Sequence, residues 1–328
     1  MRRKRVEFRL ASDDVSAIRF GVSPGYELCH AVRVLASPQA HPLQWGWLRG
    51  ARRRVPSAAF DFLRLVIGDD GYLPDFLTST PRWDLTPEQE HQRLTEADLR
   101  PMVVDLGKRA DRATGSQRDA LLTLRDDPER TRVLVSDAWR ELWEAVLAPH
   151  WPVIQQILSA DIAARSRRTS SDGIGAMVNA IDDAINWKPD AVVVELARHD
   201  EVLDCRGSGL VLVPSVMSRR CAALTELPAH PTLFYPALGV TESWTSSAAD
   251  TASSVIALLG EGRARILLSL HTPLSTSEAA AAAGLAISTA SHHLSVLRAA
   301  HLISSRREGS SVVHDRTPLG EALVNGAS

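Results

Sequence analysis

The stretch STASHHLSVLRAAHLI, residues 288–303, decides how this chain is interpreted. At about 100° per residue, the apolar side chains of this region fall on one arc of a helix and its short polar side chains fall on the opposite arc. The apolar arc consists of Ile287, Ala290, Leu294 and Leu297, and the polar arc includes Ser288, Thr289, His292 and Ser295. We therefore expect a helix that buries one face and exposes hydrogen-bonding side chains on the other.

A second helix is predicted immediately before this one. Ser275–Glu278 supplies cap candidates for an alanine-rich segment that continues to Ala283, and Gly284 stands where a helix C-terminus favours a left-handed residue. Two more short helices are expected between about Asp250 and Leu270. A helix, a short turn with glycine and a second helix make a helix-turn-helix, in which the second helix enters the DNA major groove.

Two short strand-like runs follow the second helix and flank Glu308 and Gly309. A β-hairpin behind a helix-turn-helix is a wing, which lies beside the flanking phosphates or the adjacent minor groove. Short polar side chains on the second helix suit base edges, and an arginine at its C-terminal end suits a phosphate. The predicted contacts to double-stranded operator DNA are Ser288, Thr289, Ser291, His292, Ser295, Arg298, Arg306, Arg307 and Ser310.

These residues, with Arg306-Arg307-Glu308-Gly309 behind them, resemble the ArsR-type winged helix over roughly residues 254–324. The upstream part is similar to an uncharacterised domain that accompanies ArsR-like bacterial regulators, through Ser23-Pro24 and the string GLVLVPS at 209–215. The resemblance implies a homodimeric transcription factor, usually a repressor, whose serines, threonine and histidine at 288–292 face DNA together with the wing arginines.

The chain departs from the metal-sensing members of that family. Those members carry a Cys-x-Cys motif on the first helix of the helix-turn-helix, whereas this chain reads SEAAAAA at 277–283. A second sensing position uses Asp and His on a helix after the wing, where this chain offers only Glu321. His292 and His293 are adjacent and therefore about 100° apart on a helix, so they do not form the i, i+4 pair that chelates one ion. We expect no metal and no cofactor.

Composition bounds the class of protein. The chain has 328 residues, enough for about two domains, and its 45% apolar and 23% charged residues are ordinary for a globular protein. A net charge of -2 excludes a protein that coats polyanions by bulk charge, so any DNA contact must be local. We find no membrane-length apolar run and no secretory leader, and we expect a cytoplasmic location without membrane contact. The three widely spaced cysteines predict neither a disulfide framework nor a zinc site.

The predicted fold is α+β and mainly α. Residues 1–245 are expected to form a mixed helical sensory or dimerisation region with a small antiparallel β meander, and residues 246–328 to form the winged helix-turn-helix domain. The meander is predicted from β-branched runs at 191–196, 201–205 and 210–216. A Ser-, Thr- and Ala-rich segment at 241–254 is expected to link the two parts.

Other patterns leave alternatives open. Ser23 lies in a G-x-S-x-G pattern at 21–25, which is typical of a hydrolase nucleophile, but the proline after it favours a helix cap. The tryptophans Trp139, Trp143 and Trp151 either pack in the core or line a pocket for an apolar or aromatic small-molecule effector. The leading interpretation is a regulator and not an enzyme. The alternative is an enzyme in the N-terminal region, with the winged helix as an assembly module.

Overall fold

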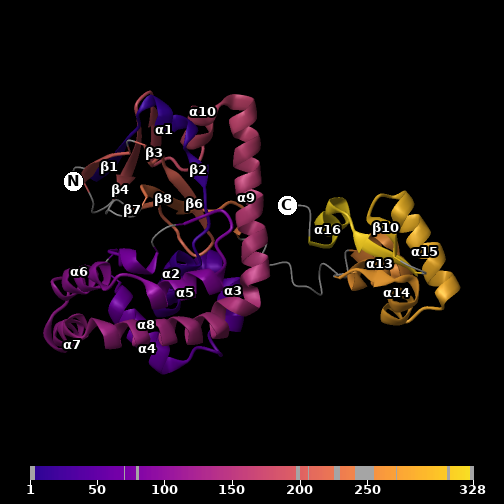
Figure 1. Ribbon diagram of the computed structural model, residues 1–328, viewed down its shortest axis with the longest axis horizontal. Helices are drawn as coiled ribbons and strands as arrows, with labels where there is room; N and C mark the ends of the chain where they lie inside the picture. The colour runs from indigo at the N-terminus through magenta and orange to yellow at the C-terminus, as the bar shows by residue number, and fades with distance from the viewer. Residues whose placement is uncertain are drawn as a thin grey trace. The chain divides into compact units, whose positions relative to one another are not determined.

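The computed structural model describes residues 4–69, 71–78, 81–196, 200–205, 207–224, 230–240, 255–270, 272–308 and 311–325. The chain divides into two compact units, Met1–Trp244 and Thr245–Ser328 (Figure 1). The first unit contains helices and two four-stranded sheets, and the second contains short helices and a β-hairpin. The predicted mainly helical α+β class is therefore confirmed. No helix in the described ranges has the length and apolar character needed to cross a membrane.

Ten α-helices of the first unit lie within the described residues. They are α1 (Ser12–Ser16), α2 (Pro24–Ala36), α3 (Trp45–Ala51), α4 (Ser57–Ile67), α5 (Pro87–Glu96), α6 (Leu99–Ala110), α7 (Gly115–Asp126), α8 (Pro128–Leu142), α9 (Trp151–Asp172) and α10 (Ile174–Asn179). A π turn at Trp143–Leu147 and a 3-10 turn at Ala148–His150 separate α8 from α9, as the prolines at 149 and 152 predict. Figure 1 shows α9 running along the unit, beside the helical half at one end and the sheets at the other.

The nucleophile-like Ser23 is the cap of α2. Its side chain accepts a hydrogen bond from the backbone N–H of Tyr26 at 3.2 Å, and Pro24 occupies the first helical position. The Ser23 side chain is buried, so its hydroxyl is committed to the helix terminus. The cap interpretation of the G-x-S-x-G pattern is the one that the geometry supports.

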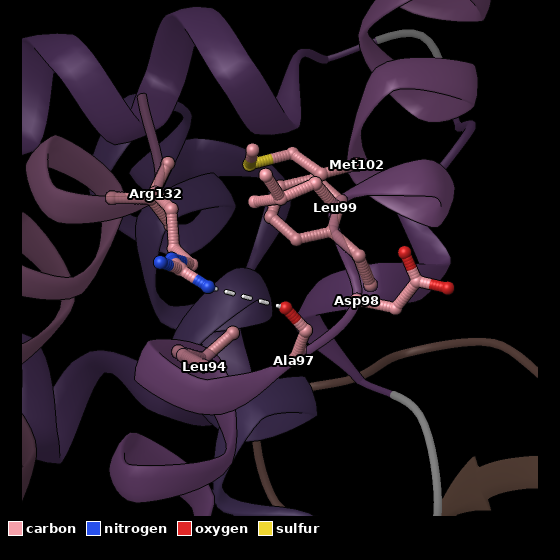
Figure 2. A pocket seen from close by; sticks show the side chains of 8 residues that line it. Leu94, Ala97, Asp98, Leu99, Met102 and Arg132 are labelled. Carbon is pink, nitrogen blue, oxygen red and sulfur yellow. Dashed lines mark hydrogen bonds between the residues drawn. The ribbon is translucent and has the colours of Figure 1, made fainter. Parts of the chain in front are cut away.

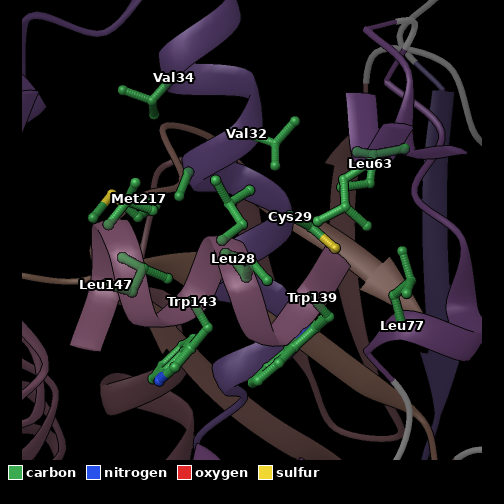
Figure 3. Close-up of a cluster of buried hydrophobic side chains, with 14 of the residues drawn as sticks. Leu28, Cys29, Val32, Val34, Leu63, Leu77, Trp139, Trp143, Leu147 and Met217 are labelled. Carbon is green, nitrogen blue, oxygen red and sulfur yellow. The ribbon is translucent and has the colours of Figure 1, made fainter. Parts of the chain in front are cut away.

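The tryptophans at the junction of α8 and α9 belong to the hydrophobic core of the first unit. The rings of Trp139 and Trp143 stack with centroids 5.1 Å apart, and Trp151 meets Trp143 edge-on at 4.9 Å. All three are buried in one cluster with Leu28 of α2 and Leu147, as Figure 3 shows for Trp139 and Trp143. The structure thus places these residues in the packing between helices, where large aromatic surfaces contribute most to stability.

The strands of the first unit form two sheets. The strands are β1 (Lys4–Arg9), β2 (Arg19–Phe20), β3 (Ile185–Lys188), β4 (Ala191–Leu196), β5 (Glu201–Asp204), β6 (Val211–Ser215), β7 (Ala222–Leu224) and β8 (Thr232–Pro236). One sheet has the order β3-β4-β1-β5 and the other has the order β2-β6-β8-β7.

The predicted antiparallel meander is wrong, although its three strands exist. The N-terminal strand β1 inserts between β4 and β5, antiparallel to the first and parallel to the second. Strand β6 joins the other sheet, parallel to both β2 and β8. Local patterns predict strands, but they carry no information on a partner strand that comes from about 190 residues away in the sequence.

A buried carboxylate ties α2 to the segment after β6. Glu27 accepts hydrogen bonds from the backbone N–H groups of Val216 at 2.9 Å and Met217 at 3.0 Å. Burial raises the pKa of Glu27 to about 7, and the two amide donors oppose that rise. The protonated form of Glu27 is therefore favoured in the folded protein well above the ordinary pKa of a glutamate.

The raised pKa predicts the sign of a pH effect on stability. Between an unfolded pKa near 4.5 and a folded pKa of about 7, the folded state binds the extra proton, so this group's stabilising contribution is lost as pH rises. From about pH 4.5 to about pH 8, we expect the wild type to lose about 3 kcal/mol of unfolding free energy relative to Glu27→Gln. Urea titrations of the wild type and of Glu27→Gln at several pH values in this range measure the difference in unfolding free energy. The control Glu141→Gln replaces an exposed glutamate and should show the same pH dependence of unfolding free energy as the wild type. If Glu27→Gln also showed that pH dependence, the assignment of the raised pKa to Glu27 would be contradicted.

A second buried network joins α9 to β8 and to the segment after it. The carboxylate of Asp161 accepts from Nε of Arg165 at 2.9 Å, from the hydroxyl of Tyr235 at 2.8 Å and from the backbone N–H of Leu238 at 3.1 Å. The Arg165 guanidinium also lies over the Tyr235 ring, 4.6 Å from its centroid. Because Asp161 and Arg165 are both buried, each charge depends on the other for compensation.

Removal of one partner should therefore be severely destabilising. Asp161→Ala leaves the Arg165 guanidinium buried without its carboxylate, and we expect a loss of about 3–5 kcal/mol of unfolding free energy. Equilibrium denaturation measures this loss. Asp137→Ala is the matched control, because its ion pair with Arg140 is exposed and should change stability by no more than about 0.5 kcal/mol. Similar losses in the two variants would refute the role given to the buried network.

The second unit is a small domain of short helices with a hairpin. Residues 255–259 are helical. The elements that follow are α13 (Glu261–Ser269), β9 (Leu274–Ser275), α14 (Thr276–Ala283), α15 (Ile287–Ala299), β10 (Ile303–Glu308), β11 (Ser311–Arg316) and α16 (Pro318–Asn325). The strands pair in the order β10-β11-β9. One apolar cluster holds the domain together and draws side chains from α13, α14 and α15.

Candidate nucleic-acid interface

The first helix of the candidate motif, α14, begins and ends at the residues that the sequence predicts. The Ser275 hydroxyl accepts from the backbone N–H of Glu278 at 3.3 Å, and the Glu278 carboxylate accepts from the backbone N–H of Ser275 at 2.8 Å. Gly284 ends the helix in the left-handed conformation, with φ of 65°. This capping box and glycine turn fix the angle at which the chain enters the next helix.

Helix α15 presents the predicted polar face. Its apolar arc packs into the domain core through Ala290, Leu294 and Leu297. The predicted DNA-contacting side chains on this helix are exposed, namely Ser288, Thr289, Ser291, His292, Ser295 and Arg298. The sequence pattern therefore correctly separates the buried arc from the polar arc of this helix, apart from its first residue.

That first residue, Ile287, was expected in the buried arc, and this expectation is wrong. Its side chain is 59% exposed. By helical spacing, Ile287 lies about 80° from Leu297 and so at the edge of the apolar arc, and as the first residue of the helix it has no preceding turn beside it. The exposed face of α15 thus carries one large apolar side chain among polar ones.

The wing is the antiparallel hairpin of β10 and β11. Arg306 pairs in register with Val313, and Arg307 pairs with Val312. Both arginine side chains are exposed, and Nη1 of Arg306 lies 4.0 Å from the carboxylate of Asp315. The predicted contact Ser310 lies outside the described residues.

Two side chains that the sequence analysis did not single out hold the wing in place. His314, on β11, is buried and hydrogen-bonds Ser305 of β10 through Nδ1 at 2.8 Å and Thr276 of α14 through Nε2 at 3.0 Å. Burial, with a smaller effect of Arg298, lowers the pKa of His314, which favours its neutral form. Arg316 donates to the carbonyl oxygens of Leu267 and Leu268 at the end of α13, each at 2.8 Å. A histidine or arginine within a strand pattern gives no sequence signal of this role.

The first unit contains a small recess between α5, α6 and α8. It is lined by Phe76, Leu94, Ala97, Asp98, Leu99, Met102, Arg132 and Val135. Figure 2 shows the Arg132 guanidinium reaching the carbonyl oxygen of Ala97, at 3.5 Å. Its cavity volume of about 20 Å³ is about the space that one water molecule needs. The predicted pocket tryptophans lie in the core and not on the wall of this recess.

The capped first helix, the glycine turn, the exposed polar helix and the hairpin together define a winged helix-turn-helix domain of the ArsR type, a DNA-binding class. A model described as a helix-turn-helix domain matches residues 261–306. A second model, described as a family of unknown function (DUF5937), matches residues 65–239, which is more than half of the chain, and the protein belongs to this family. No curated protein matches the chain.

The arrangement predicts that the α15 side chains contact bases and that the wing arginines contact phosphates. Ser291→Ala with His292→Ala should lower affinity for a specific site by about 5- to 150-fold, because groups on the major-groove face are lost. Arg306→Ala with Arg307→Ala should weaken binding to all sequences alike and reduce the salt slope by about one per lost phosphate contact. Anisotropy titrations at several salt concentrations measure both effects.

The control for these variants is Arg130→Ala, an exposed arginine of α8 in the other unit. It should leave both affinity and salt slope unchanged. Unaltered specific affinity in the Ser291 and His292 double variant, with its fold intact by circular dichroism, would refute the placement of α15 in the groove.

Proposed function

We propose that this protein is a transcriptional repressor that binds operator DNA as a homodimer and is controlled by a small-molecule effector through its first unit. The observation that carries the proposal is the polar face of α15, where the six predicted contacts at 288–298 are all exposed while Ala290, Leu294 and Leu297 on the opposite face are buried. Small polar side chains of this kind suit base edges, because they allow the helix backbone to approach the groove floor.

The dimer is supported by apolar side chains at both ends of the second unit. Leu258, in the helical residues 255–259, is 67% exposed, and Leu319 of α16 is 55% exposed. One recognition helix reads only a few base pairs, so two copies on a two-fold axis supply the site length that genomic specificity needs. We propose that these two leucines are covered in the homodimer. Occupied operator DNA is then closed to the transcription machinery, which is the simplest route to repression.

Metal sensing and catalysis are not part of the proposal. Helix α14 holds no cysteine or histidine, and its Glu278 is engaged in the capping box. Among the residues that the structure describes, no group of three His, Cys, Asp or Glu side chains is arranged to hold a metal ion. The one nucleophile-like motif is a helix cap. We propose an organic effector and a regulatory role for the first unit.

Footprinting of the full-length chain on the DNA upstream of its own gene tests the proposal. We expect protection of an inverted repeat whose half-sites are centred a whole number of DNA turns apart, about 34–36 Å per turn. Addition of zinc should leave the footprint unchanged. Protection of no specific sequence would overturn the proposed function, and loss of the footprint with zinc that a chelator reverses would overturn its metal-independent form.

Introducing charged side chains into the proposed interface tests the homodimer. Leu258→Asp with Leu319→Asp should convert the dimer to a monomer in sedimentation equilibrium, because an aspartate that becomes buried without a partner is strongly unfavourable. Operator affinity should fall as the dimer dissociates, since a monomer holds only one half-site. Val104→Asp on α6 is the matched control, with an exposed apolar residue in the first unit. A double variant that remains dimeric would contradict this interface.

A further inference from the structure

One large apolar side chain interrupts the polar face of α15. Ile287 is 59% exposed at the first helical position, and the next two residues, Ser288 and Thr289, are also exposed. Ser291 follows Ile287 by one turn on the same side of the helix. An exposed isoleucine on a face that is otherwise polar offers an apolar contact to whatever binds that face.

The position of Ile287 limits what can cover it. It stands at the N-terminal end of α15, and the N-terminal residues of a recognition helix are those that contact base edges. The exposed leucines at 258 and 319 lie on other helices, whereas Ile287 is continuous with the polar residues of the DNA-binding face. The surface that would cover both Ile287 and these polar residues is the floor of the major groove.

We infer that Ile287 determines specificity by packing against the 5-methyl group of a thymine in each operator half-site. This inference rests on the proposed function. Thymine alone among the four DNA bases presents a methyl group in the major groove, and apolar side chains discriminate it by contact. A branched aliphatic side chain has no donor or acceptor for the other base edges, so a cytosine or purine at that position leaves the isoleucine partly in water.

Deoxyuridine in place of thymidine isolates this contact, because the two nucleosides differ only in the 5-methyl group. The full-length chain is titrated against the footprinted operator and against copies in which one thymidine of each half-site is replaced symmetrically by deoxyuridine. At one position we expect wild-type affinity to fall about fourfold per half-site, or about tenfold or more for the dimer, from the loss of one buried methyl on each side.

The variant Ile287→Ala completes a double-mutant cycle, in which the isoleucine and the thymine methyl group are removed separately and together. On the thymidine operator it should bind more weakly than the wild type, and at that same position it should no longer distinguish thymidine from deoxyuridine. Val133→Ala, a matched β-branched residue that is 57% exposed on α8, should retain the full discrimination. Ile287 is exposed, so its truncation should leave the thermal unfolding midpoint within about two degrees of the wild type.

The outcomes separate this inference from the proposed function. Equal discrimination by wild type and Ile287→Ala at every thymine position overturns the inference alone, as does operator binding by the wild type that is indifferent to every deoxyuridine. A change of oligomeric state in Ile287→Ala, with discrimination intact, also overturns it and assigns the side chain to a protein contact. Failure of the wild type to bind any specific sequence overturns both.

Discussion

The second unit depends on the burial of one arc of α15. Ala290, Leu294 and Leu297 pack against α13 and α14, and this packing fixes the rotation of the helix about its own axis. Rotation by even one residue position, about 100°, would bring a serine or histidine into the core without a partner. The exposed polar face is therefore a consequence of the packed one. The same side chains that fold the domain determine which groups of α15 are exposed to solvent.

Polar side chains hold the wing in place, whereas apolar side chains hold α15 in place. His314 bridges β10 and α14 by its two ring nitrogens, and Arg316 bonds the last carbonyl oxygens of α13. Both side chains are buried, so breaking either set would leave unsatisfied polar groups in the interior. The hairpin is thus held at a defined position relative to α14 even though it protrudes. A wing arginine can be placed against a phosphate only if the hairpin that carries it is fixed in this way.

The sequence predicts those features that depend on neighbouring residues. The cap at Ser275, the left-handed Gly284 and the two arcs of α15 follow from spacings within one helix, and each is confirmed apart from Ile287. The sheet order is not predictable in this way, because β1 reaches β4 and β5 across the whole first unit. His314 acts through Thr276, which is distant in sequence, so no local pattern marks it. Ile287 shows the limit of periodicity, since a helix end can leave an apolar residue outside the core that its spacing assigns to it.

The buried carboxylates of the first unit join its helices to backbone segments that follow its strands. Asp161 binds the backbone of Leu238, close to the end of the described part of this unit, and so joins that segment to the long helix α9. Glu27 likewise joins α2 to the backbone that follows β6. An effector alters operator affinity only if it binds two arrangements of the protein unequally, and a coupling of about 1–3 kcal/mol changes affinity some 5- to 150-fold. Separating α9 from the segment around Leu238 breaks the hydrogen bond from the Leu238 backbone N–H to Asp161, so this network opposes independent movement of the two.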